Sequence, residues 1–388
     1  MEHFENHALY ELLRIALDDG RSPRCFSRHL TPKEWDNLHS ECVKQALLGV
    51  VYRAICLLPR DLQPPLEIAF QWASEAEAIK GHNKLLNAEA AWLTDHFAAD
   101  GHKTAVLKGP ANARLYPDPN IRQAGDIDLW VDGGRESVFA LLKKLGYEIQ
   151  EKDLIASSHH VQLFPARNNI PVEIHYRPSS GTWTPFTRRR VLRFLENEIQ
   201  NVERVSEGFY VPSVKFALVM QLAHIHHHFI TEGVGFKQII DYYMLLMRSS
   251  EEDRCEIAAN LSRFGLLRVC RALMWIMDYV FELDKSKMLC EPNEKHGKKM
   301  LAIVQKDGNF GAYAADRSDE SSMNFLKRWF RYRWRVLRMF WFDPFEVLGC
   351  EFDYCVRFVK AIGIRIKLRR LSLWGMYHTR YIDKKPND

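Results

Sequence analysis

The spacing of apolar residues divides the chain into regions of different secondary structure. From Leu9 to about Asp100, apolar residues recur at intervals of three and four, as in VKQALLGVVYRAICLL, which predicts a helical N-terminal region over 1–101. The prolines at 64 and 65 are well placed to begin a long helix, because proline is tolerated in a first helical turn. We expect Gly101 to end that helix.

From residue 102 to about residue 180 the pattern changes to short apolar runs separated by turn residues. The runs TAVLK, DIDLWV, YEIQ, VQLFPA and PVEIHYR predict strands, with a helix in ESVFALLKKLG. Helical spacing returns over 181–320, and 321–388 forms a separate basic and aromatic segment. We therefore expect an α+β fold, in which a small mixed sheet is flanked by helical regions before and after it.

The run DIDLWV carries the first candidate for chemistry. Alternate residues of a strand point to the same face, so Asp126 and Asp128 project together while Ile127 and Leu129 are buried behind them. Two ionised carboxylates in one small volume repel each other unless a cation neutralises them. Mg²⁺ and Mn²⁺ prefer carboxylate oxygen, so the pattern predicts a divalent metal site.

Glu173 lies in VEIHY with the same alternation, so a neighbouring strand could add a third carboxylate to the pair. Three acidic groups suffice for two ions, which can activate an attacking hydroxyl and stabilise a leaving pyrophosphate. We therefore assign Asp126, Asp128 and Glu173 as both metal ligands and catalytic residues. In this hypothesis Glu173 also helps to take the proton of the acceptor.

Five further residues are candidates for binding the nucleotide phosphates. Lys108 and Gly109 lie where a strand gives way to a helix, which exposes backbone N–H groups to a phosphate. Arg122 could supply a second positive clamp. His175 and Arg177 would point with Glu173 if the strand stays regular, and they could orient the carboxylate or contact phosphate.

Taken together, LKG, LYPDPNIRQAGDIDLWV and VEIHYRP resemble the signature of the polymerase-beta-type nucleotidyltransferase superfamily. More narrowly, they resemble an uncharacterised family of bacterial nucleotidyltransferases that share a KG, an Arg before DIDL and a VEIHW-like strand. The similarity covers about Leu107 to Arg177, and more weakly the segment HIHHHF to GVGFKQIIDYYMLL. It implies Mg²⁺- or Mn²⁺-dependent transfer of a nucleoside monophosphate from a nucleoside triphosphate to an unidentified acceptor hydroxyl.

Two alternatives to that function stay open. Lys-Gly-Pro stands where the wider superfamily has Gly-Gly or Gly-Ser, which motivates a non-catalytic nucleotide-binding scaffold. A toxin-like enzyme that modifies tRNA or protein is the other alternative. The motifs specify neither the base nor the acceptor nor the oligomeric state.

Histidines form a second group of candidates. His224 and His228 are one helical turn apart and could bind zinc together, but the segment has no HExxH motif. We therefore favour packed or capping histidines for His224, His226, His227 and His228. His159 and His160 are expected in a loop.

Composition and charge bear on location and partners. Eight scattered cysteines without a CxxC pair are typical of reduced thiols, and the acidic, helical N-terminus lacks the pattern of a signal peptide, so we expect a cytoplasmic protein. Residues 325–382 hold thirteen Lys or Arg against four Asp or Glu. This segment could bind the anionic inner face of a membrane or a nucleic acid, or pack its arginine stems over its own aromatic rings. Packing is favoured first and peripheral membrane contact second.

Overall fold

A computed structural model describes residues 2–18, 26, 28–149, 159–313 and 325–367. The N-terminal region is helical, as predicted. Pro65 is the N-cap of the longest helix, and Gly101 follows its end in a turn with φ 81°. The prediction of a long helix between the proline pair and Gly101 is therefore confirmed. The four helices are α1 (Glu2–Leu17), α2 (Pro32–Gln45), α3 (Leu48–Leu57) and α4 (Leu66–Ala98).

A small mixed sheet follows, in the order β1-β2-β4-β3. The first two strands are antiparallel, β2 and β4 are parallel, and β3 runs antiparallel to β4 at the edge. This arrangement confirms the α+β fold class. The strands are β1 (Thr104–Val106), β2 (Ile127–Val131), β3 (His160–Gln162) and β4 (Val172–His175), with α5 (Pro110–Ala113) and α6 (Gly134–Lys144) in the connections.

Three sequence-based expectations are corrected by the structure. Residues Tyr147–Ile149 of the run YEIQ form no strand, because one backbone bond, from Glu148 N to Phe164 O at 2.8 Å, makes no ladder. His160 belongs to β3 and not to a loop. The region expected to be helical after the sheet contains a hairpin of β5 (Val202–Arg204) and β6 (Tyr210–Pro212), whose turn includes Gly208 at φ 96°.

The two faces of the sheet belong to different hydrophobic clusters. Ile127, Leu129 and Ile174 pack with residues of α4 and α6. Ala105 and Trp130 point the other way and pack with the helical half of the chain. The alternation of the strands thus seals one face under α4 and α6, and the face that carries the predicted carboxylates is turned toward the helices that follow the sheet.

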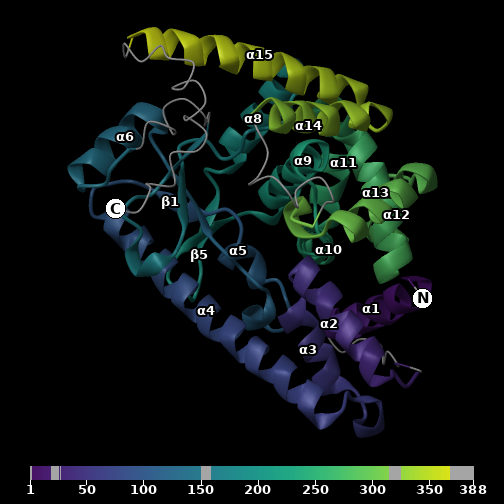
Figure 1. Ribbon diagram of the computed structural model, residues 1–388. Helices are drawn as coiled ribbons and strands as arrows, with labels where there is room; N and C mark the ends of the chain where they lie inside the picture. Colours follow the sequence, from purple (N-terminus) through teal and green to yellow (C-terminus); the bar gives the residue numbers. More distant parts are fainter. Residues whose placement is uncertain (1, 19–25, 27, 150–158, 314–324, 368–388) are drawn as a thin grey trace.

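The helical half lies beside the sheet, and α14 and α15 form its outer layer (Figure 1). No helix within the described ranges has the length and apolarity needed to cross a membrane. The helices of this half are α8 (Pro185–Glu198), α9 (Val214–Thr231), α10 (Phe236–Arg248), α11 (Glu251–Phe264), α12 (Leu267–Phe281), α13 (Glu294–Asp307), α14 (Phe325–Leu337) and α15 (Pro344–Lys367).

Some arginines of the basic segment are used inside the fold. Arg333 is buried, forms an ion pair with Glu351 and lies 4.1 Å from the ring centroid of Tyr354. Arg335 is also buried and donates to the backbone oxygen of Glu232. Packing of arginine stems over aromatic rings is therefore present in this part of the segment, whereas 368–382 lie outside the described residues.

Candidate active site

Strand pairing brings two of the predicted carboxylates side by side. Asp128 of β2 and Glu173 of β4 are direct partners in the parallel register, so their side chains leave the same face of the sheet. Asp126 lies just before β2 and two residues from Asp128. Ile127 and Leu129 are fully buried on the opposite face, as the alternation predicts.

Asp128 is the centre of a buried set of charges. Its Oδ1 lies 3.0 Å from Lys108 Nζ and 3.0 Å from His175 Nε2. Burial opposes the charged carboxylate, but Lys108 and the hydrogen bond from His175 hold the pKa of Asp128 below its usual range. Burial likewise opposes the charge of Lys108, whose pKa is nevertheless raised by Asp128, Asp126 and Glu173.

The pKa values of the other two carboxylates, Asp126 and Glu173, are shifted in opposite directions. Burial and the neighbouring charge of Asp128 raise the pKa of Asp126. Burial also acts on Glu173, but a hydrogen bond from His175 lowers the pKa of that carboxyl. Burial acts against the charged form of His175, whose pKa is raised by its hydrogen bonds to Asp128 and Glu173. The site therefore carries an excess of negative charge, and bringing its carboxylates closer together would increase their mutual repulsion.

Gly109 places the segment after β1 directly against the backbone just before β2. Its backbone has φ 58° and ψ −110°, a conformation that residues with a Cβ rarely adopt. A Cβ at this position would lie 2.8 Å from the backbone oxygen of Asp126. The glycine therefore permits the close approach that keeps Lys108 beside the carboxylates.

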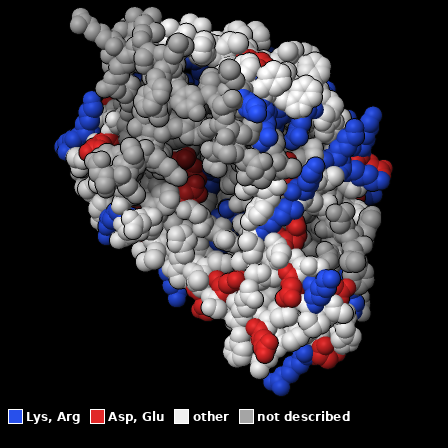
Figure 2. Space-filling model, viewed as in Figure 1, with Lys and Arg blue, Asp and Glu red and all other residues white. Residues whose placement is uncertain are grey.

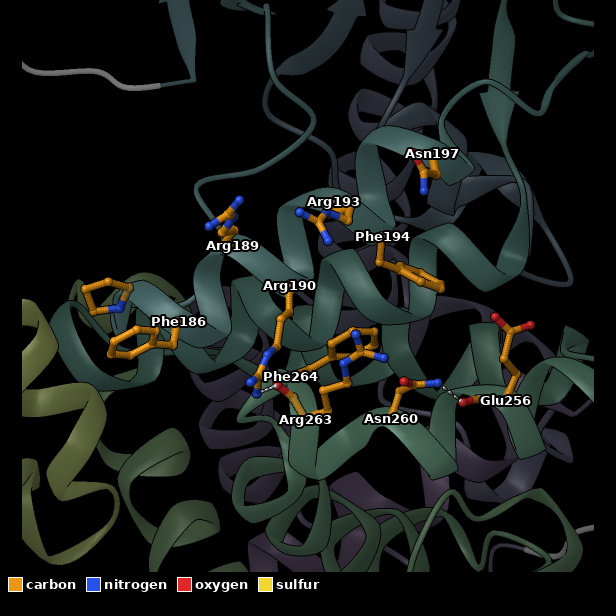
Figure 3. Close-up of a pocket in the computed structure, with 11 residues that line it drawn as sticks. Phe186, Arg189, Arg190, Arg193, Phe194, Asn197, Glu256, Asn260, Arg263 and Phe264 are labelled. Atoms are coloured by element: carbon orange, nitrogen blue, oxygen red, sulfur yellow. Dashed lines mark hydrogen bonds between the residues drawn. The ribbon is translucent and has the colours of Figure 1, made fainter.

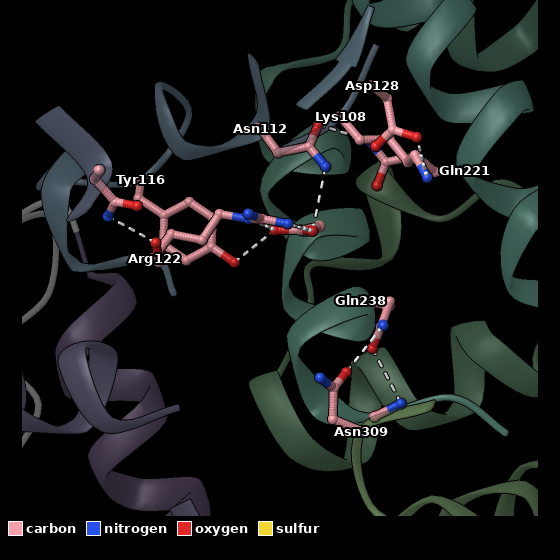
Figure 4. A network of polar contacts seen from close by, with 11 residues as sticks. Lys108, Asn112, Tyr116, Arg122, Asp128, Gln221, Gln238 and Asn309 are labelled. Atoms are coloured by element: carbon pink, nitrogen blue, oxygen red, sulfur yellow. Dashed lines mark hydrogen bonds and ion pairs between the residues drawn. The ribbon is translucent and has the colours of Figure 1, made fainter. Parts of the chain in front are cut away.

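Arg122 is held by a partner on α10. Its Nε and NH2 donate to Asp241 Oδ1 and Oδ2, each at 2.6 Å, and both side chains are buried. Tyr116 and Asn112 also donate to Asp241, at 2.8 and 3.2 Å (Figure 4). The structure thus places Arg122 in a network that fastens the segment between β1 and β2 to the helical half, which makes it a positioning residue.

Two histidines, His160 and His175, lie on the face of Glu173, and His159 precedes β3 beside them. His160 is the register partner of His175, and the ring centroids of His159, His160 and His175 lie 4.4 to 5.4 Å apart. Burial lowers the pKa of His159 and His160. Donor atoms of these three residues lie within 4.8 Å of one another, as do those of Asp128, Glu173 and His175. Both sets have the spacing that a bound ion needs.

A family model described as uncharacterised nucleotidyltransferase matches residues 31–282, which is more than half of the chain. The chain belongs to this family. The match includes every predicted site residue, and it makes the chain an enzyme, a nucleotidyltransferase. No curated protein and no solved structure matches it.

In this nucleotidyltransferase Arg177 does not join the carboxylates. The strand ends at His175, and beyond it the guanidinium of Arg177 lies 3.4 Å from Glu196 of α8, with half of the side chain exposed. The expectation that Arg177 points with Glu173 assumed a longer regular strand.

The histidines of α9 have neighbours of their own. His227 stacks on Trp183 with ring centroids 4.0 Å apart, His228 pairs with Glu232 at 3.0 Å, and buried His226 lies 3.4 Å from Asp343. The ring of His224 lies 4.2 Å from that of His228. These ring and ion-pair contacts agree with the packing role that the sequence analysis favoured.

Lys237 is a cation whose charge acts on Asp126 and which the sequence analysis missed. It is the second residue of α10, and burial and the nearby charge of Arg122 lower its pKa to about 8, while Asp241 and Asp126 act in the opposite direction. Its Nζ lies 6.0 Å from the ring centroid of Phe310. The helical pattern of FKQIIDYY gave no sign that the charge of this lysine acts on Asp126, more than one hundred residues earlier.

An arginine-lined groove lies apart from the carboxylates, between α8 and α11. It encloses about 810 Å³ and shares no residue with the site on the sheet (Figure 3). In the part of the chain that the structure describes, none of its arginines forms an ion pair. The groove is lined by Pro185, Phe186, Arg189, Arg190, Arg193, Phe194, Asn197, Glu256, Asn260, Arg263 and Phe264.

Proposed function

We propose that this nucleotidyltransferase moves a nucleoside monophosphate from a nucleoside triphosphate to an acceptor hydroxyl. The observation that carries the proposal is the pairing of Asp128 with Glu173 on one sheet face, with Asp126 two residues away. Lys108 is the positive partner among them. Three carboxylates facing one lysine suit a divalent cation.

In this proposal Asp126, Asp128 and Glu173 hold Mg²⁺ or Mn²⁺. The buried, mutually repelling acids fit such an ion, since the pKa of Asp126 is raised by burial and by Asp128. When bound, the ion supplies charge neutralisation and a more acidic acceptor hydroxyl.

The residues of the chain have separate tasks in the transfer. The acceptor oxygen attacks the α-phosphorus, the bond from that phosphorus to the bridging oxygen breaks, and pyrophosphate leaves. Glu173 takes the proton of the acceptor hydroxyl. Lys108 and Lys237 offer their ammonium groups to the triphosphate, while His175 orients Asp128 through its 3.0 Å contact.

The test compares nucleotide transfer by the full chain and by matched variants. Each labelled nucleoside triphosphate is incubated with the ion and with pools of small-molecule, protein and RNA acceptors. We expect Asp126→Asn and Asp128→Asn to lower transfer by about 100-fold or more. Asp132→Asn is the matched control, because Asp132 follows the same strand but contacts His102 and Lys103 instead.

Retained nucleotide binding without any aspartate-dependent transfer would favour the non-catalytic scaffold. Transfer that persists in both aspartate variants would reject the proposed site.

A polyanionic acceptor such as tRNA is the second candidate, and the arginine groove favours it. Four arginines and three phenylalanines, with one carboxylate, Glu256, suit phosphate and base contacts. In that case expression of the chain inhibits growth, and Asp128→Asn relieves the inhibition. Arg190→Ala with Arg193→Ala weakens RNA labelling while leaving the labelling of small acceptors unchanged.

A further inference from the structure

The two histidines on the carboxylate face turn one ring nitrogen each toward an acid. His160 of β3 and His175 of β4 are register partners, and their ring centroids lie 5.2 Å apart with an angle of 37° between the rings. His175 Nε2 lies 3.0 Å from Asp128 Oδ1. His160 Nε2 lies 3.7 Å from Glu173 Oε2. The Nδ1 atom of each ring is therefore left for a different neighbour.

A third imidazole, that of His159, completes a group on the Nδ1 side of His160. His159 Nε2 lies 3.0 Å from His160 Nδ1. Donor atoms of His159, His160 and His175 lie within 4.8 Å of one another. His175 Nδ1 is buried and has no hydrogen-bond partner among the described residues. A buried nitrogen without a partner thus belongs to a group of three imidazoles.

A hydrogen bond between His159 and His160 accounts for only part of this arrangement. One neutral ring can donate to the other across 3.0 Å, but this bond involves no atom of His175. It leaves His175 Nδ1 buried and unsatisfied, which folded proteins generally avoid. One ion bound by all three rings would satisfy a nitrogen of each.

The chemistry and the spacing of the three rings suit Zn²⁺. Zn–N bonds of about 2.0–2.1 Å place the nitrogens of a tetrahedral site about 3.3–3.4 Å apart, close to the 3.0 Å between His159 and His160. A histidine that binds a metal through one ring nitrogen usually donates its other N–H to a carboxylate or carbonyl. His175 Nε2 has such a partner in Asp128.

We propose that His159, His160 and His175 bind one Zn²⁺ ion, separate from the divalent ion of the proposed function. His160 and His175 contribute Nδ1, His159 contributes Nε2, and the fourth position stays open to water or a substrate oxygen. The ion would fasten the edge strand β3 to β4. Through the Nε2–H of His175 it would also fix the orientation of Asp128.

The test measures ion binding to the full chain without nucleotide or turnover. After removal of metal by a chelator, the chain is titrated with Zn²⁺ by calorimetry and with Co²⁺ by visible absorption. His159 decides the result, because it belongs to the group of three histidines and not to the group of Asp128, Glu173 and His175. We expect His159→Ala and His160→Ala each to weaken binding at this site by about tenfold or more.

Further variants guard this comparison. His160→Gln keeps a polar side chain on the edge strand and should lose affinity as His160→Ala does, and the unfolding midpoint without metal shows whether each variant folds. Asp126→Asn removes a predicted ligand of the catalytic ion and should leave Co²⁺ absorption at the histidines unchanged. His102→Ala is the matched control: its Nδ1 lies 3.1 Å from Asp132 Oδ1, and no donor group of the described residues contains it.

Unchanged Zn²⁺ and Co²⁺ affinity in folded His159 and His160 variants would overturn the inference. X-ray absorption of the Zn²⁺ complex without imidazole scattering would overturn it as well. Aspartate-dependent transfer together with Zn²⁺ binding that ignores His159 would reject this site and leave the proposed function intact. Histidine-dependent Zn²⁺ binding without any transfer would support this site and count against the proposed function.

Discussion

Gly109 illustrates how one residue sets the distance between two parts of the site. Its φ of 58° and the 2.8 Å between an added Cβ and Asp126 O leave no room for a side chain. The residue before it, Lys108, reaches Asp128 at 3.0 Å. A shift of this backbone would therefore move the lysine away from the carboxylates.

We predict that Gly109→Ala lowers the free energy of unfolding by about 1–3 kcal/mol, the usual cost of a strained backbone conformation. Nucleotide transfer should fall further than stability alone explains, because Lys108 is displaced. Urea unfolding and transfer assays measure the two effects. Gly125→Ala is the control, since an added Cβ there meets open space. Equal effects of both substitutions would contradict the prediction.

A role of Lys237 in phosphate binding would make nucleotide affinity depend on pH. Its pKa is lowered to about 8, so it carries full charge at lower pH and loses that charge as the pH rises through this value. If its ammonium binds phosphate, nucleotide affinity weakens above about pH 8, and bound phosphate shifts the midpoint upward. In Lys237→Arg the charge persists, so the dissociation constant should stay flat over the same range. Parallel curves for both proteins would exclude Lys237 as a phosphate contact.

At the scale of elements, the segment from β1 to β2 is tied to α10 by one buried ion pair. Asp241 accepts two bonds from Arg122 and one each from Tyr116 and Asn112. Each donor comes from the segment that begins at Lys108, so the helical half fixes the conformation of the segment before β2.

We predict that Asp241→Asn lowers the free energy of unfolding by about 3 kcal/mol or more, because it leaves Arg122 buried without its counter-charge. Replacing both partners, as in Arg122→Met with Asp241→Leu, should recover part of this loss. Urea denaturation measures each variant. Glu294→Gln, which removes an exposed pair with Lys298, is the control and should leave the unfolding midpoint unchanged. A similar midpoint for Asp241→Asn would show that the pair contributes little.

The strands of the site could be predicted because the pattern that indicates each strand lies within a few neighbouring residues. Alternation in DIDLWV and VEIHY predicted two strands and the shared face of Asp128 and Glu173. The order of the strands depends on pairing between distant parts of the chain, so the edge position of His160 was missed. Arg122 and Asp241 are 119 residues apart, and no local pattern joins a loop arginine to a helical aspartate over that distance. Lys237 escaped notice for the same reason.

On the scale of the whole molecule, α14 and α15 expose an unusual number of aromatic side chains. Basic and uncharged side chains are interspersed over the upper part of the view in Figure 2, where these helices lie. A large apolar surface beside cations is typical of attachment to an anionic lipid surface. The exposed large apolar residues of α14, of the 3₁₀ turn Arg338–Trp341 and of α15 are Trp329, Phe330, Trp334, Leu337, Phe340, Phe345, Leu348, Phe352, Phe358 and Val359.

We predict that the chain sediments with vesicles containing phosphatidylserine and less with neutral vesicles. Phe330→Ser with Trp334→Ser should weaken this binding by about tenfold or more, because burying one such side chain is worth about 1.5–3 kcal/mol. The control is Phe70→Ser on α4, which removes an equally exposed aromatic ring elsewhere. Absent vesicle binding, or binding that the double variant keeps, would refute this surface; binding of RNA instead would point to the other partner class.

The sheet separates two hydrophobic clusters, one with α4 and α6 and one in the helical half, and its carboxylates face the helical half. A nucleotide that binds both Lys108 and Lys237 would connect the sheet to the helical half. The free energy of nucleotide binding is lost when either the sheet region or the helical half unfolds. Saturating nucleotide should therefore raise the unfolding temperatures of both parts together and merge separate calorimetric peaks into one.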